Sequence, residues 1–473
     1  MKTLKKLGLL ILGALICANV GIVSANTAGV YNAAFATTAS ARLSNGATVT
    51  YTATLPSVPV TDDGLIYLYA LQPYEYAVSA GDPVVASAPA SQTPVFSFAL
   101  NGMICNKFAL AIKSGGVVTM IANAQYITNP EAAATQTRPV QGVGFVEPYD
   151  KMSLFRIGES SVELYKLGNY STTVIVNKVD PDLIHPAAKI PETHRMTNAK
   201  QYYMLNAANA TGVAKLSALM KNLAGGTNID EFIVGNEVNA RCWNYVSYMN
   251  WDQYIREYAQ AFRVAYNSIK STNANATVFI SLDQCWDRNR SQDQYDYIDS
   301  ADFLIKFNQI ICSEGNIDWG LAAHPYLTPL TYAKFWDMSG CPSGSYYAQQ
   351  ISGNKMLSFQ NLPIMTSFMM LPAMLSPKGG VRTIILPEVG ITQAQGVDVQ
   401  AAAMVACYTA CRNNPAIKRI YFHRMNEGGA LNFSTVGQSE AVYQALLAGN
   451  PGQYDAWAKS YIGIADWHQI LSY

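Results

Sequence analysis

The sequence has no excess of charge of either sign. Its 473 residues include 32 Lys and Arg and 32 Asp and Glu, which gives a formal net charge of zero. Nucleic acids and anionic membrane surfaces are usually bound through clusters of excess basic residues. We therefore expect neither of them as a partner. Half of the residues are hydrophobic, which instead predicts a folded chain with a large core.

Motifs of several catalytic classes are also missing. No GxSxG segment marks the nucleophile of a Ser-His-Asp hydrolase, and no GxxxxGK segment marks a phosphate-binding loop. The five histidines are scattered and have no ligand spacing, either to each other or to cysteines. We therefore predict neither a metal site nor a cofactor.

Beyond the N-terminal region no stretch has 18 uninterrupted apolar residues, so we expect no membrane insertion. The N-terminal region itself has three lysines, then the apolar run Leu7–Ile16, then small residues at Val23–Ala25. This pattern predicts a bacterial-type signal peptide at residues 1–25 and a secreted or cell-surface protein. A lipoprotein anchor at Cys17 is the alternative, which the bulky Ile16 disfavours.

Without Cys17, seven cysteines remain, and an odd number leaves at least one free thiol. Cys407 and Cys411 have the spacing that places two side chains on one face of a helix. We favour their interpretation as small buried residues, with a disulfide as the remaining option.

Residues 26–127 are predicted to form an all-β sandwich. Short alternating segments are separated by turn signals such as Asn45-Gly46, and Ser114-Gly115-Gly116 predicts a hairpin. Exposed tyrosines of such a module could bind sugar, but we favour packing for the four candidates: Tyr67, Tyr69, Tyr74 and Tyr76. Residues 128–139 are small, polar and bounded by proline, which predicts an interdomain linker.

From residue 140 onward, apolar strand-like runs are separated by helix-length segments, which predicts parallel βα units. The clearest runs are 172–176, 232–234, 278–282, 319–323, 383–386 and 417–422. Their spacing predicts a (β/α)8 TIM-type barrel over residues 140–473. Only roughly 30 residues precede the first of these runs, whereas two βα units usually need about 60. We therefore expect an abbreviated N-terminal part, with 142–146 and 153–157 as short strands.

The active site of such a barrel forms at the C-terminal ends of its strands. Two single acids stand out there: Glu237 follows the run Phe232–Val234, and Glu388 follows Ile384–Leu386. Two carboxylates that meet across a barrel mouth are what glycosidic bond cleavage needs. One protonates the leaving oxygen, and the other attacks the anomeric carbon or activates a water. A buried structural role is the alternative for each acid.

Other polar and aromatic residues near the strand ends are predicted to bind substrate. Aromatic faces could stack on a sugar ring, and amides could bind its hydroxyls. The predicted substrate-binding residues are Asn236, Asn239, Trp243, Asp283, Trp286, His324, Tyr326, His423 and Arg424.

The pair Asn236-Glu237 after one strand, with Glu388 three βα units later, resembles clan A of the retaining glycoside hydrolases. In that clan an Asn-Glu pair ends strand four and supplies the acid/base, and a glutamate that ends strand seven is the nucleophile. The resemblance implies that Phe232–Gly235 is strand four and that Thr383–Leu386 is strand seven. It also implies a retaining mechanism.

A closer resemblance is to a poorly characterised secreted bacterial family with a β-rich N-terminal module and a glycosidase-like barrel. It covers nearly the whole chain after the signal peptide. Its five landmarks occur here in order, at Asn129–Glu131, Gly235–Asn239, Trp243–Tyr245, His324–Tyr326 and Leu386–Gly390. The clan resemblance further implies that His324 or Tyr326 positions the nucleophile, and that His423 and Arg424 line a sugar subsite at strand eight.

We therefore predict a secreted glycoside hydrolase that cleaves an oligo- or polysaccharide by a retaining two-carboxylate mechanism. Glu237 is the expected acid/base and Glu388 the expected nucleophile, with their carboxyl groups roughly 5–5.5 Å apart. The alternative is a catalytically inactive barrel that binds carbohydrate, which the compressed region 140–172 would favour. The sugar, its linkage and the oligomeric state do not follow from the sequence.

Overall fold

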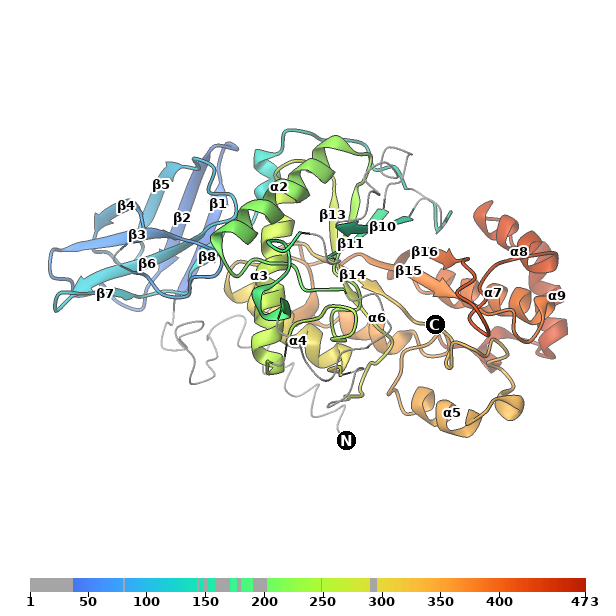
Figure 1. Ribbon diagram of the computed structural model, residues 1–473. Helices are drawn as coiled ribbons and strands as arrows, with labels where there is room; N and C mark the ends of the chain where they lie inside the picture. The colour runs from blue at the N-terminus through green and yellow to red at the C-terminus, as the bar shows by residue number, and fades with distance from the viewer. Residues whose placement is uncertain are drawn as a thin grey trace.

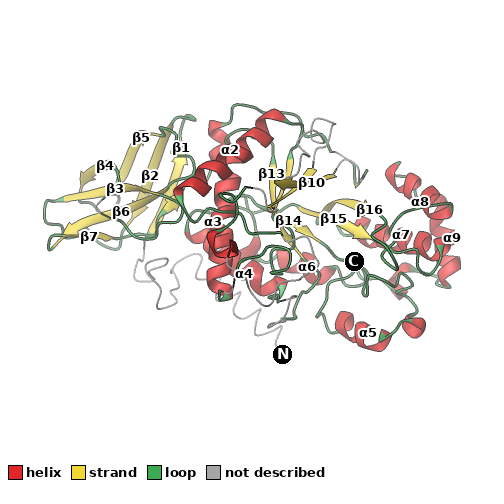
Figure 2. Ribbon diagram, in the orientation of Figure 1, coloured by secondary structure: helices red, strands yellow, loops and turns green. Residues whose placement is uncertain are grey.

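The computed structural model describes residues 37–79, 81–142, 144–148, 152–157, 171–176, 180–189, 202–247, 249–289 and 296–473. The predicted signal peptide therefore lies outside the described residues. Two antiparallel sheets near the N-terminus are followed by one parallel sheet with flanking helices (Figure 1 and Figure 2). In Figure 1 the antiparallel sheets and the C-terminal helices lie at opposite ends of the molecule, with the parallel sheet between them.

The antiparallel sheets have the strand orders β1-β2-β5 and β4-β3-β6-β7, with β8 paired to β6. Their strands are β1 (Thr38–Leu43), β2 (Thr48–Thr54), β3 (Leu65–Leu71), β4 (Val84–Pro89), β5 (Val95–Ala99), β6 (Lys107–Ser114), β7 (Val117–Met120) and β8 (Gln125–Tyr126). Phe98 of β5 lies edge-on to Phe108 of β6, with ring centroids 5.0 Å apart, where the inner faces meet. The two sheets therefore share one core, as a sandwich does.

The predicted hairpin is confirmed, and the four candidate tyrosines are buried or half-buried. Gly115 and Gly116 join β6 to β7 with φ values of +59° and +77°, which the two-residue hairpin turn requires. Tyr69 is buried, and the hydroxyl of Tyr67 donates to Asp63 at 2.5 Å. The hydroxyl of Tyr76 donates to Gln260 Oε1 of the helix Trp251–Lys270 at 2.5 Å, so both of these hydroxyls already have partners within the protein.

The segment predicted as a linker contains the short helix η1 (Pro130–Ala133) and is hydrogen-bonded at both ends. Asn129 Oδ1 accepts from Leu43 N at 2.8 Å, and Asn129 Nδ2 donates to Leu43 O at 2.9 Å. Gln136 N donates to Thr272 O at 2.9 Å. These bonds fix the segment against both the first antiparallel sheet and the helical part of the chain.

In the parallel sheet β10 to β16 follow one another in chain order, and β9 pairs with β16. The strands are β9 (Val146–Glu147), β10 (Met152–Ile157), β11 (Ser171–Val176), β12 (Glu231–Val234), β13 (Thr277–Leu282), β14 (Gly320–Ala323), β15 (Ile384–Gly390) and β16 (Ile417–His423). Parallel ladders join all neighbours, but the described residues form none between β9 and β10. Pairing of the first strand with the last is how a barrel closes, so this is a curled sheet of the barrel type.

Helices lie between the later strands and after the last one. They are α2 (Ala210–Gly226), α3 (Trp251–Lys270), α4 (Ser300–Ser313), α5 (Gly344–Ser352), α6 (Pro363–Met369), α7 (Val397–Arg412), α8 (Gln438–Leu447) and α9 (Gly452–Ile462). Short helices are η4 (Pro186–Lys189), η5 (Met338–Gly340), η6 (Pro372–Met374) and η7 (Trp467–Gln469). Only residues 148–151 separate β9 from β10, too few for a crossover helix. The abbreviated N-terminal part is therefore confirmed at this connection.

Two further observations concern the membrane and the thiols. No described helix combines the length and the apolar character that a membrane crossing requires. The described cysteines are all free thiols. Cys407 and Cys411 are fully buried on α7, which confirms their interpretation as small buried residues.

At the N-terminal ends of the strands the curled sheet encloses an ion pair. Arg419 of β16 contacts the carboxylate of Glu231 of β12, and Tyr421 donates to the same carboxylate at 2.9 Å. Replacing Arg419 with methionine removes the guanidinium that contacts Glu231 and lies 3.8 Å from Glu147. We expect the free energy of unfolding to fall by about 3–5 kcal/mol in urea titrations. The double variant Glu231→Gln, Arg419→Met should recover part of this loss, because Glu147 keeps its charge, and an unchanged midpoint of unfolding in the single variant would count against the ion pair.

Candidate active site

The interior of the curled sheet is filled in layers. One layer takes one residue from each of β12 to β15: Ile233, Phe279, Ala322 and Ile385. Side chains two positions apart on a strand point to the same face. The next layer toward the C-terminal ends therefore begins with Ser281 of β13 and with His324, which directly follows β14. Glu237 and Glu388 contact this layer from the ends of β12 and β15.

Glu237 lies in a tight turn after β12. Gly235 has a φ of +77° and Glu237 itself a φ of +41°, in the left-handed region that favours glycine. A non-glycine residue there costs about 1–3 kcal/mol and persists where its surroundings hold it. Ser281 holds this turn, because its Oγ accepts from Glu237 N at 3.0 Å and its carbonyl accepts from Val238 N at 2.9 Å.

Glu388 lies at a bulge of β15. The register of β15 against β16 shifts between Leu386 and Val389, so β15 has an extra residue at this point. Pro387 has no N–H to donate, which suits a position where a ladder is interrupted. The hydroxyl of Tyr326 donates to Glu388 Oε2 at 2.9 Å and fixes the carboxylate.

The two carboxylates meet at His324. Its Nδ1 lies 2.9 Å from Glu237 Oε1 and 3.6 Å from Glu388 Oε2. One oxygen of each carboxylate and this nitrogen all lie within 4.8 Å of one another. The two acids are therefore closer than the roughly 6.5–9.5 Å between the carboxyl groups of inverting glycosidases, which fits the shorter spacing of retaining ones. The side chains of Glu237 and Glu388 are 13% and 20% exposed, and that of His324 only 1%, so the histidine lies beneath two partly exposed acids.

The ionisation of these groups follows from their burial and mutual charge. Burial raises the pKa of Glu237 to about 7, and the hydrogen bond with His324 opposes this rise only in part. Burial lowers the pKa of His324, but the carboxylates of Glu388 and Glu237 outweigh it and raise that pKa overall. A carboxyl group half protonated near neutral pH suits a group that first donates and then accepts a proton.

The same three ligand atoms lie close enough together to hold a metal ion. Hydrogen bonds already account for their positions, since His324 bonds to Glu237 and Tyr326 bonds to Glu388. The absence of a metal from the site stays a prediction.

Asn236 has an unused acceptor beside Glu237. Its side chain is 9% exposed, and its Oδ1 has no hydrogen-bond partner among the described residues. An unsatisfied buried polar group costs about 1–3 kcal/mol, so such groups usually have a functional reason. Because this oxygen is itself buried, the contact of Asn236 with substrate stays a prediction.

Asn239 supports the site and does not bind substrate, which corrects the prediction for this residue. It is fully buried, its Nδ2 donates to Asp283 Oδ1 at 2.7 Å, and its Oδ1 accepts from Asp283 N at 3.0 Å. Its amide therefore has no free side for a ligand. Asp283 is half-buried, and burial raises its pKa although the hydrogen bond from Asn239 opposes the rise.

Trp286 is likewise not available to a sugar, whereas Arg424 is engaged but partly exposed. Trp286 is buried and lies edge-on to Phe368, with ring centroids 5.3 Å apart, so it has no open face to stack on a ligand. The guanidinium of Arg424 lies 3.9 Å from the ring centroid of Tyr443 and contacts Glu440. The prediction for Trp286 failed because the run that precedes a residue does not determine the direction of its side chain. The side chain of Arg424 is 30% exposed, so its role in binding stays a prediction.

Trp243 and His423 each pack on another aromatic ring. Trp243 is half-buried and stacks on Tyr202, with centroids 5.7 Å apart. His423 is buried, with its Nε2 2.8 Å from Glu427 Oε1 and its ring edge-on to Phe433 at 5.2 Å.

Two residues of the site were missed from the sequence. Phe433 packs on the rings of both Tyr326 and His423, and it lies in a loop without any periodic pattern. Ser281 is concealed within the apolar run of β13. The sequence did contain a signal for Ser281. It is a polar residue two positions after Phe279 and therefore lies on the same interior face of the strand.

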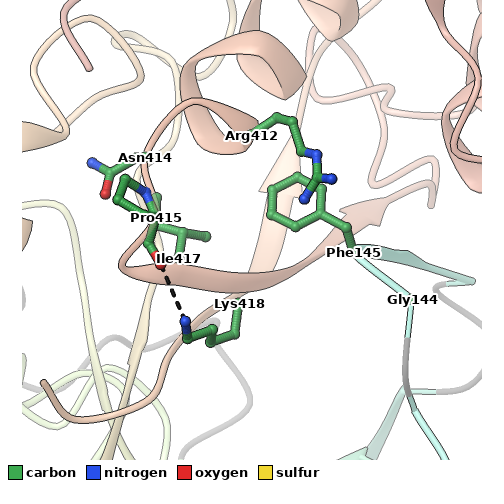
Figure 3. A pocket seen from close by; sticks show the side chains of 7 residues that line it. All are labelled: Gly144, Phe145, Arg412, Asn414, Pro415, Ile417 and Lys418. Atoms are coloured by element: carbon green, nitrogen blue, oxygen red, sulfur yellow. Dashed lines mark hydrogen bonds between the residues drawn. The ribbon is translucent and has the colours of Figure 1, made fainter. Parts of the chain in front are cut away.

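A separate cavity of about 380 Å³ lies near the N-terminal end of β16 (Figure 3). It is lined by Gly144, Phe145, Arg412, Asn414, Pro415, Ile417 and Lys418. The guanidinium of Arg412 lies 5.2 Å from the ring centroid of Phe145. The lining includes none of the predicted site residues, and active sites of barrels form at the opposite ends of the strands. We therefore do not take this cavity as the active site.

The sequence model of DUF5722, described as a family of unknown function, matches residues 159–470. The chain belongs to this family. The match spans about two thirds of the chain and contains every site residue named above, whereas the antiparallel sheets lie outside it. Among curated proteins nothing matches the chain.

This DUF5722 protein is similar to solved structures of glycoside hydrolases. One is a family 39 glycoside hydrolase from Bacteroides cellulosilyticus WH2, with 12% identity, 85% of this chain and 80% of that chain covered, and a TM-score of 0.39. Another is a GH128 endo-β-1,3-glucanase from Sorangium cellulosum, with 12% identity, 64% and 96% covered, and a TM-score of 0.32. A β-D-glucuronidase from Dictyoglomus thermophilum has 10% identity, 90% and 68% covered, and a TM-score of 0.29. These TM-scores are too low to establish a fold. The fold of this chain is instead established by the strand order and the registers of its own sheet.

Proposed function

We propose that this DUF5722 protein is a retaining glycoside hydrolase, with Glu237 as acid/base and Glu388 as nucleophile. The supporting observation is that two carboxylates from the C-terminal ends of β12 and β15 have oxygens within 4.8 Å of each other. In this proposal the sheet closes into a (β/α)8 barrel in which β12 is the fourth strand and β15 the seventh. The antiparallel sheets then form an accessory module over residues 26–127.

The reaction proceeds in two displacements. First, the Glu388 carboxylate attacks the anomeric carbon while Glu237 gives its proton to the glycosidic oxygen, so the leaving sugar departs and a glycosyl ester forms on Glu388. Then Glu237, now ionised, takes a proton from a water that attacks the same carbon and frees Glu388. Two inversions at one carbon retain its configuration.

The neighbouring groups have defined tasks in this sequence. The Tyr326 hydroxyl, 2.9 Å from Glu388 Oε2, orients the nucleophile. The imidazole of His324 lies between the acids, so it interacts with whichever carboxylate is charged. The unpaired Oδ1 of Asn236 accepts a hydrogen bond from a sugar hydroxyl.

The test is turnover of a panel of aryl glycosides and oligosaccharides, with the first product followed by proton NMR. We expect release of a sugar whose anomeric configuration equals that of the substrate, and loss of release in Glu388→Ala. A product of inverted configuration, or turnover that survives the substitution, would show that the mechanism is wrong.

The alternative is a catalytically inactive barrel that binds carbohydrate. It is favoured by the two-residue strand β9, which has no ladder to β10 among the described residues. Such a protein would bind an oligosaccharide saturably in calorimetry, both as wild type and as Glu388→Ala, and would release no sugar in either form.

We further propose that residues 1–25 are removed during export. N-terminal sequencing of the secreted protein should then begin at Asn26. A mature chain that begins at Cys17 would identify the lipoprotein alternative instead.

A further inference from the structure

Ser281 lies beside Glu237 and His324 and is fully buried on β13. Its Oγ lies 3.0 Å from Glu237 N and 3.3 Å from His324 Nε2, and its carbonyl accepts from Val238 N at 2.9 Å. One residue therefore contacts both the backbone of the proposed acid/base and the imidazole that joins it to Glu388.

The proton positions follow from what each group can donate. A backbone N–H can only donate, so Ser281 Oγ accepts from Glu237 N and keeps its own hydrogen for another partner. His324 Nε2 is such a partner, and it can accept this hydrogen only while it carries no proton itself. The other tautomer would leave the buried hydroxyl hydrogen without a partner among the described residues, and it would turn the lone pair of Nδ1 toward Glu237 Oε1 and Glu388 Oε2. The single proton of the neutral ring is therefore assigned to Nδ1.

We propose that Ser281 is a positioning residue, whose hydroxyl holds neutral His324 in the tautomer with its proton on Nδ1 while its Oγ and carbonyl hold the turn at Glu237. The Nδ1 proton is thereby kept between the two acids as negative charge moves from one to the other. The tautomer stands independently of any activity, whereas its catalytic consequence rests on the proposed function.

Protonation of the ring changes the direction of one hydrogen bond. When Nε2 takes a second proton, the hydroxyl turns and accepts from it, because a hydroxyl has one hydrogen and two lone pairs. The ionisable groups that act on His324 are Glu237, Glu388 and Asp283. The ring therefore remains hydrogen-bonded in both charge states.

The tautomer can be read directly by NMR of the full-length protein. Selective ¹⁵N labelling of the five histidines and long-range ¹H–¹⁵N correlations show which ring nitrogen carries the proton, and His324→Gln assigns the signal. In the wild type, at a pH where the ring is neutral, we expect the proton on Nδ1. A proton on Nε2 would overturn the inference without reference to any variant.

Three variants separate positioning from mere packing. Ser281→Ala removes the hydroxyl, and its ring should show the Nε2 tautomer or a mixture. Ser281→Thr keeps a hydroxyl and should keep the wild-type pattern. Ser358→Ala is the matched control, because Ser358 is also fully buried but its Oγ has no hydrogen-bond partner among the described residues.

Activity provides the second readout. Ser281→Ala should lower kcat by about 10–100-fold with little change in KM, since the residue does not touch substrate, and Ser281→Thr should restore most of the loss. A folded Ser281→Ala with wild-type kcat and tautomer would overturn the inference. A wild type with the expected tautomer but no turnover on any glycoside would instead count against the proposed function alone. If Ser281→Ala does not fold, the inference is tested by the tautomer of His324 in the wild type and in Ser281→Thr. A proton on Nε2 in either protein would overturn it.

Discussion

Replacing Glu388 with alanine is expected to lower kcat by about 10⁴-fold or more, the range that follows removal of a covalent nucleophile. Without this carboxylate no glycosyl ester forms, and the first displacement loses its attacking group. The loss should appear at saturating substrate, because the carboxylate acts on the anomeric carbon in the transition state. The loss of kcat is measured in discontinuous assays with aryl glycosides at saturating concentration.

The matched control is Glu257→Gln on α3. Glu257 lies 3.4 Å from His185 and takes no part in the candidate site, so this variant should retain wild-type turnover. A comparable loss in both variants would indicate general damage to the fold, and a small loss in Glu388→Ala would remove Glu388 from the mechanism.

Rescue of the variants by azide tests which acid is the nucleophile and which is the acid/base. In Glu388→Ala the space left by the carboxylate admits a small anion on that face, so azide should restore turnover and give a glycosyl azide of inverted configuration. In Glu237→Ala the ester on Glu388 still forms, and azide attacks from the opposite face with net retention. The same configuration from both variants would contradict the assigned roles.

The sequence was sufficient to predict where the two acids lie along the fold. Apolar runs such as Phe232–Val234 are long enough to mark buried strands, and parallel strands place their C-terminal ends at one edge. Counting strands from 146–147 onward makes β12 the fourth and β15 the seventh. That order depends only on hydrophobic pattern and chain connectivity, which the sequence records directly.

Side-chain directions and local irregularities were harder to predict. Asn239, Trp286 and Arg424 follow strands as the candidates do, yet each turns toward a partner that is distant in the sequence. The bulge at Glu388 depends on the register of β16, which no local pattern records. Strand β4 contains alanine, serine and proline, which are weak strand formers, and it is extended because it pairs with β3.

Replacing Glu237 with glutamine should separate substrates by their leaving groups. For a poor leaving group, kcat/KM should fall by about 10²–10⁴-fold, the contribution of general acid catalysis. An aryl glycoside with a strongly acidic phenol needs no proton and should lose far less. The wild type should also lose activity as pH rises through about 7, where Glu237 gives up its proton, and this alkaline limb should be absent in the variant. Equal losses for both leaving groups would exclude Glu237 as the acid.

The same substitution should make the protein more stable at alkaline pH. Burial raises the pKa of Glu237 from 4.5 to about 7 in the folded protein, so between these values the folded state holds a proton that the unfolded state releases. Stability therefore falls as pH rises across this window, and above it the full cost of a buried carboxylate is present. Glutamine carries no charge, so urea unfolding of Glu237→Gln should show a gain over wild type at pH 8 that shrinks or disappears at pH 4.5. A wild type that is the more stable protein at pH 8 would mean that His324 compensates the charge of Glu237 in full.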